Sequence, residues 1–74
     1  MMPLTFAQSG ELHVIKHVGG PEKTRKFLAN LGFVSGSDIV VISKNASNLI
    51  VNVKDCRVAI SGEMANKIMV WKEL

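Results

Sequence analysis

The sequence predicts a small, mainly β domain in which one helix is inserted between strands. Two observations support this prediction. From residue 38 onward, short segments rich in β-branched residues follow one another and are separated by brief polar turns. Ahead of them, residues 21–31 space their apolar side chains as a helix does. A parallel sheet would need longer crossover connections, so we expect one antiparallel domain covering residues 1–74.

The N-terminal part of the chain is expected to supply one strand and the helix. Residues 1–9 read as a loosely ordered lead-in anchored by Leu4 and Phe6, and the first strand runs from Leu12 to Val18. Gly19 and Gly20 end this strand. Pro21 suits the first helical position, because its φ is already helical and its missing N–H would have no partner there.

The helix is predicted to bury one stripe, formed by Phe27, Leu28 and Leu31. Gly32 follows directly, which favours a helix end in the left-handed conformation that glycine adopts without a Cβ penalty. Gly36 allows a second turn with positive φ before the strand that contains residues 39–42.

The C-terminal half reads as β structure. Residues 45–48 form a polar hairpin turn, and Ser61 is placed to cap a single helical turn. Ile68 and Val70 should face inward on the last strand, with Met69 and Trp71 outward. Inward positions on the preceding two strands are Leu49, Val51, Val53, Cys56, Val58 and Ile60.

About five short strands, one helix and tight turns predict a closed or nearly closed antiparallel barrel, an arrangement that leaves few exposed edges. An SH3-like barrel fits best. An OB-like barrel is the alternative, but its helix normally follows the third strand, whereas this helix follows the first.

Composition points to an intracellular protein outside the membrane. Residues 1–8 contain no Lys or Arg and do not resemble a secretory signal. Aliphatic runs are far shorter than the ~20 residues of a membrane-spanning helix. The single cysteine, Cys56, fits a reducing compartment, so we expect a cytoplasmic location. The net charge of +3 comes mostly from scattered residues, and the cluster at residues 23–26 reads as a solvated helix face.

No catalytic, cofactor or metal site is predicted. The sequence offers no nucleophile beside an orienting base and no pair of carboxylates. Cys56 is expected to be a small buried hydrophobe. His13 and His17 are four residues apart on a strand, which places them about 13 Å apart on its outer face, too far to share a metal ion.

One set of positions follows a family pattern: Gly10-Glu11, Ile15, Val18 to Gly20, Arg25, Leu28, residues 31–41 with the motif Leu31-Gly32-Phe33-Val34-Ser35-Gly36, and residues 58–70. At these positions the chain resembles the FeoA family of small proteins associated with bacterial ferrous iron transport. The resemblance implies an SH3-like fold and a partner, the FeoB-type membrane iron permease with its cytosolic GTPase region. It also implies an adaptor that is not an enzyme.

Five residues are candidates for contact with that partner. Phe33 and Val34 lie between the two glycines, and we expect one of them to plug the barrel while the other stays exposed. Lys23 and Lys26 on the helix and Trp71 on the last strand complete the set. Two alternatives stay open: binding of nucleic acid through the basic helix, and a domain akin to the SH3-like domain of iron-dependent repressors.

Overall fold

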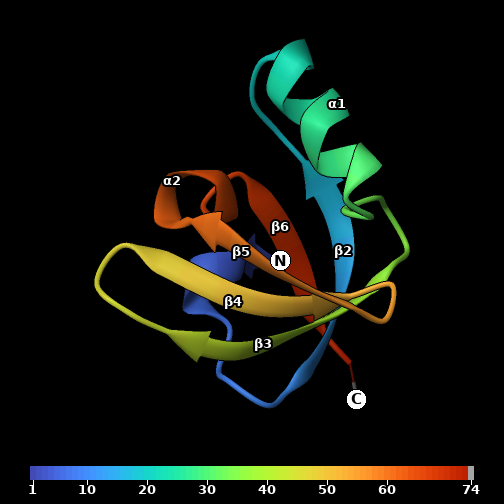
Figure 1. Ribbon diagram of the computed structural model, residues 1–74. Coiled ribbons are helices and arrows are strands. Elements are labelled where there is room, and N and C mark those ends of the chain that lie inside the picture. Colours follow the sequence, from blue (N-terminus) through green and yellow to red (C-terminus); the bar gives the residue numbers. More distant parts are fainter. Residues whose placement is uncertain (74) are drawn as a thin grey trace.

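The computed structural model describes residues 1–73 (Figure 1). The elements, in chain order, are β1 (Met2–Pro3), the 3-10 helix η1 (Leu4–Phe6), β2 (Leu12–Val18), α1 (Glu22–Asn30), β3 (Asp38–Lys44), β4 (Asn48–Val53), β5 (Cys56–Ser61), α2 (Gly62–Ala65) and β6 (Ile68–Lys72).

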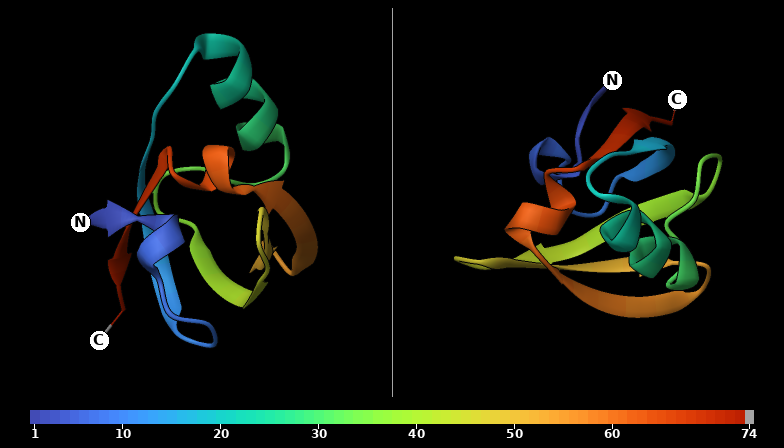
Figure 2. Two further views of the ribbon diagram at one scale, coloured as in Figure 1. Left: turned by 90° about the vertical axis from the view of Figure 1, so that its left-hand side faces the viewer. Right: turned by 90° about the horizontal axis from the view of Figure 1, so that it is seen from above.

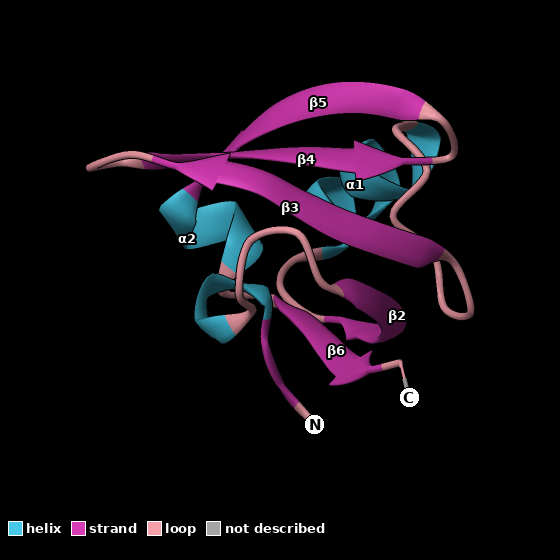
Figure 3. Ribbon diagram, turned by 90° about the horizontal axis from the view of Figure 1, so that it is seen from below, coloured by secondary structure: helices cyan, strands magenta, loops and turns pink. Residues whose placement is uncertain are grey.

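All six strands belong to one antiparallel sheet, in the order β1-β6-β2-β3-β4-β5. The sheet curls around its own inner face, and α2 and η1 lie between its two edges, with α2 in contact with β5 and η1 in contact with α2 and β6 (Figures 2 and 3). The predicted mainly β fold with one inserted helix is therefore confirmed. The helix follows the first long strand, as the sequence indicates.

The N-terminal residues are more structured than expected. Met2 pairs with Val70 of β6, and Pro3 pairs with Met69, so these residues add a short sixth strand. Leu4 is fully buried, as predicted for an anchor, but Phe6 is 70% exposed. The sequence did not predict the strand β1, because a two-residue strand is too short to show a period-2 pattern.

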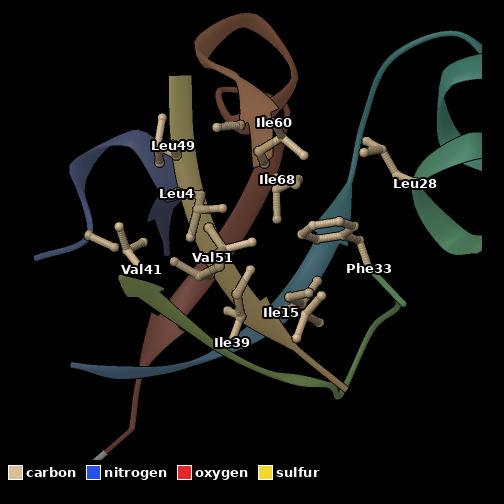
Figure 4. Close-up of a cluster of buried hydrophobic side chains, with 14 residues drawn as sticks. Leu4, Ile15, Leu28, Phe33, Ile39, Val41, Leu49, Val51, Ile60 and Ile68 are labelled. Carbon is tan, nitrogen blue, oxygen red and sulfur yellow. The ribbon is translucent and has the colours of Figure 1, made fainter. Parts of the chain in front are cut away.

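The core fills the inside of the curled sheet (Figure 4). Leu49, Val51 and Val53 all face inward along β4, as their alternation predicts. Ile68 and Val70 do the same on β6. The remaining core residues are Leu4, Ala7, Ile15, Leu28, Phe33, Ile39, Val41, Ile60 and Ala65. The short helix α2 begins at Ser61, whose hydroxyl oxygen accepts a hydrogen bond from the Met64 N–H at 3.2 Å.

The end of α1 is a Schellman motif, which directs the following residue into the core. The Gly32 N–H donates to the Ala29 carbonyl, and the Phe33 N–H donates to the Leu28 carbonyl, each at 3.0 Å. Gly32 has φ of +106°, the positive value expected from the sequence. The Phe33 ring then lies beside Leu28 in the interior (Figure 4). Leu28 is the buried residue of α1, so the predicted stripe is narrower than expected, and Phe27 lies outside it.

We predict that Phe33→Ala lowers the free energy of unfolding by about 3–5 kcal/mol, because the substitution removes a buried aromatic ring and leaves a cavity. Val34→Ala, one position along, should change this free energy by less than about 0.5 kcal/mol, since Val34 is on the surface. Urea unfolding followed by Trp71 fluorescence measures both. Similar losses for the two variants would contradict the inward position of Phe33.

Candidate interaction surfaces

As predicted from the sequence, one of Phe33 and Val34 is buried and the other is exposed. Phe33 is 1% exposed and plugs the barrel, whereas Val34 is 37% exposed. The turn that carries Val34 is fixed against β2, because the Gly36 N–H donates to the Ile15 carbonyl at 2.7 Å and the Ile15 N–H donates to the Ser37 carbonyl at 2.9 Å. Phe33 is thus part of the fold and is not accessible to a partner.

Helix α1 stands apart from the sheet, joined to it mainly through its C-terminal end (Figures 1 and 2). Lys23, Arg25 and Lys26 are exposed on it, and Lys26 forms an ion pair with Glu22 at 3.0 Å. Two further lysines cover the glycines that flank the helix. A methyl group on Gly20 would lie 2.9 Å from Lys67 Cδ, and one on Gly32 would lie 2.8 Å from Lys54 Cγ. We call the five residues Lys23, Arg25, Lys26, Lys54 and Lys67 the basic helix surface.

Trp71 lies on the outer face of the sheet and is 50% exposed. It pairs with Val14 across β6 and β2. Leu12, two residues before Val14 and so on the same face, pairs with Val40 of β3. Leu12, Val14, Val40 and Trp71 therefore form one apolar patch, which we call the outer sheet face.

An open hollow adjoins the outer sheet face. Leu12 and Val40 contribute apolar lining to it, and Asp38, Asn52, Lys54 and Asp55 contribute polar groups. Lys54, a member of the basic helix surface, therefore also lines this hollow. A side chain of a partner with an apolar stem and a polar end would match this lining. The structure thus separates the sequence candidates into two regions: Trp71 on the outer sheet face, and Lys23 and Lys26 on the basic helix surface.

Phe27 is a surface residue that the sequence analysis placed in the core. It is 51% exposed, on the same helix as Lys23 and Lys26. The spacing of Phe27, Leu28 and Leu31 predicts one apolar stripe. It does not show which part of that stripe contacts the core, and within α1 the buried residue is Leu28. An exposed aromatic ring among basic side chains is a feature that sequence reasoning missed.

The prediction for the two histidines was wrong in part. His17 is exposed, but His13 is fully buried and faces the core side of β2. The pairing of β2 with β6 shifts register between Ile15 and His17, so this irregularity moves the two side chains out of phase. The His13 Nδ1 lies 3.2 Å from the Glu11 carbonyl oxygen, and its Nε2 has no hydrogen-bond partner among the described residues.

The prediction that Cys56 is buried was also wrong: its thiol is free and exposed. Cys56 is the first residue of the edge strand β5, directly after the two-residue turn Lys54-Asp55. It shares the pleat of Val58 and Ile60, and burial along this face of β5 falls from buried Ile60 through half-buried Val58 to exposed Cys56. Within residues 1–73, no group of three or more His, Cys, Asp and Glu side chains is arranged to hold a metal ion.

Comparison with known proteins matches residues 2–72 to the model of the FeoA domain. The chain belongs to the FeoA family. A relative from Methanocaldococcus jannaschii, named "Putative Fe(2+) transport protein A", is 33% identical over 70 residues, which is 95% of this chain and 85% of that protein. In the described part of the chain, no helix has the length and apolar character needed to cross a membrane.

Solved FeoA structures share the fold over nearly the whole chain. The crystal structure of an iron uptake regulatory protein, FeoA, is 26% identical and superposes with a TM-score of 0.90 over 97% of each chain. FeoA of Stenotrophomonas maltophilia, described as a procaryotic SH3 domain protein and solved in complex with zinc, is 24% identical with a TM-score of 0.83 over 95% of this chain and 89% of that one. The SH3-like fold predicted from the sequence is confirmed.

We predict that Cys56 reacts with a thiol reagent such as iodoacetamide at similar rates in the folded protein and in denaturant, because Cys56 is exposed. The two rates should differ by no more than a few-fold. Mass spectrometry of quenched samples follows the reaction. A folded-state rate slower by two or more orders of magnitude would place Cys56 in the interior, as the sequence pattern had indicated.

Proposed function

We propose that this chain is a non-catalytic regulator of ferrous iron uptake that acts in the cytoplasm on an FeoB-type membrane permease. Membership of the FeoA family carries the proposal. The Methanocaldococcus jannaschii relative is named for Fe(2+) transport, and the FeoA structure at 26% identity is named for regulation of iron uptake. The sequence offers no nucleophile beside an orienting base, and a protein that acts by binding needs none.

The outer sheet face is the better candidate for contact with a folded protein partner. Binding energy at protein interfaces concentrates in a few buried aromatic and arginine side chains, whereas lysine is depleted there. With Phe33 in the core, Trp71 is the exposed aromatic residue of β6, where it pairs with Val14 of β2. Leu12 lies two residues before Val14 on the same face. Val34 adds a smaller apolar contact, and Lys23 and Lys26 lie on a separate surface.

The proposal predicts that Trp71→Ala weakens binding to the cytosolic region of an FeoB-type permease by about tenfold or more, because it removes an aromatic anchor. Isothermal titration of the purified chain against that region, with GDP and with a non-hydrolysable GTP analogue, measures the affinity. Phe6→Ala is the matched control, since Phe6 is 70% exposed and belongs to the N-terminal segment. The control should bind as the wild type does.

Two outcomes would count against this assignment. If Trp71→Ala keeps wild-type affinity and Val34→Ala loses it, the interface lies at the turn before β3. If the wild-type chain binds the cytosolic region in neither nucleotide state, the adaptor role itself is contradicted. Each variant is compared at equal folded fraction, checked by circular dichroism.

A further inference from the structure

The basic helix surface carries five of the nine basic residues of this chain. The acids beside it are Glu22, which pairs with Lys26, and Asp38 and Asp55, which line a hollow together with Lys54. These groups give the surface a net charge of +2, in a chain whose net charge is +3. An approaching anionic body is therefore attracted toward α1 and its flanks.

The same helix carries an apolar side chain that the fold does not use. Phe27 lies on α1 and is 51% exposed. In the sequence it follows Lys23 and Lys26 and precedes Leu31. The helix projects from the barrel in the views of Figures 1 and 2. An open hollow on it is lined by Glu22, Arg25, Lys26 and Ala29.

We propose that the basic helix surface binds the anionic phospholipid surface of a membrane, with Phe27 entering the headgroup region. Four of its five basic residues are lysine, a compact point charge that pairs with phosphate without the geometric demands of arginine. Lysine is depleted at protein interfaces, but clusters of it attract proteins to anionic bilayers. Interfacial helices combine basic residues with exposed aromatic side chains, and α1 has both. The aliphatic stems of Lys67 and Lys54 lie over Gly20 and Gly32.

This inference does not require the permease. It assigns the basic helix surface to lipid and leaves the outer sheet face for a protein. Binding to the bilayer through α1 would place the barrel at the membrane surface, where a cytosolic region of a membrane protein lies.

Co-sedimentation of the purified full chain with vesicles tests the proposal. Vesicles of equal parts phosphatidylglycerol and phosphatidylcholine should bind the chain at least tenfold more strongly than pure phosphatidylcholine vesicles do, and added salt should remove the difference. The double variant Lys23→Gln/Arg25→Gln should bind anionic vesicles about tenfold or more weakly than the wild type. The matched control Lys44→Gln/Lys72→Gln removes the same charge elsewhere and should lose much less.

The aromatic residue is tested separately. Phe27→Ala should weaken binding to the anionic vesicles several-fold, while Phe6→Ala, also exposed but outside α1, should not. The four variants alter six exposed side chains, and thermal melting checks the fold of each variant.

Three results would overturn the proposal. The first is no binding of the wild type to anionic vesicles at low salt. The second is equal loss in the two charge variants, which would show a response to net charge alone. The third is displacement from vesicles by a single-stranded oligonucleotide at a lower phosphate concentration than lipid requires, which would assign the surface to nucleic acid. None of them bears on the test with Trp71→Ala, so failure here leaves the proposed function standing.

Discussion

The Schellman motif at the end of α1 is the constraint on which the rest of the structure depends. Gly32, at φ of +106°, turns the chain so that the Phe33 N–H reaches the Leu28 carbonyl at 3.0 Å. That turn places Phe33 and Leu28 side by side at the open end of the barrel (Figure 4). In a domain of 74 residues, with one small core, the loss of an aromatic side chain from this position is a large fraction of the stability.

The same turn determines which side chains remain available for binding. Because Phe33 is used as the plug and Leu28 as its neighbour, Val34 and Phe27 are left on the surface. Because α1 is held at its C-terminal end, the helix that carries Lys23, Arg25 and Lys26 stands away from the sheet (Figure 2). The outer sheet face forms independently, from the pairing of β2 with β3 and β6. One small fold therefore presents a basic surface and an apolar surface of different chemistry.

Local patterns predicted the strands β2 to β6, the helix α1, the positive φ of Gly32 and Gly36, and the inward-facing residues of β4, because each depends on residues close in sequence. The errors at His13 and Cys56 have a different origin. The phase of His13 depends on a register shift against β6, and the exposure of Cys56 depends on where the core ends along β5. Both are tertiary effects. For the same reason, the sequence predicted that Trp71 faces outward. It did not show that Leu12, Val14 and Val40 lie on the same patch.

A double-mutant cycle between Leu28 and Phe33 tests the central claim most directly, namely that these residues close the barrel as one unit. Free energies of unfolding in urea are measured for the wild type, Leu28→Ala, Phe33→Ala and the double variant. We predict a coupling energy of about 1 kcal/mol or more, because either truncation removes the surface on which the other side chain packs. Additive losses, with a coupling below about 0.3 kcal/mol, would show that the two side chains act separately and would contradict the claim.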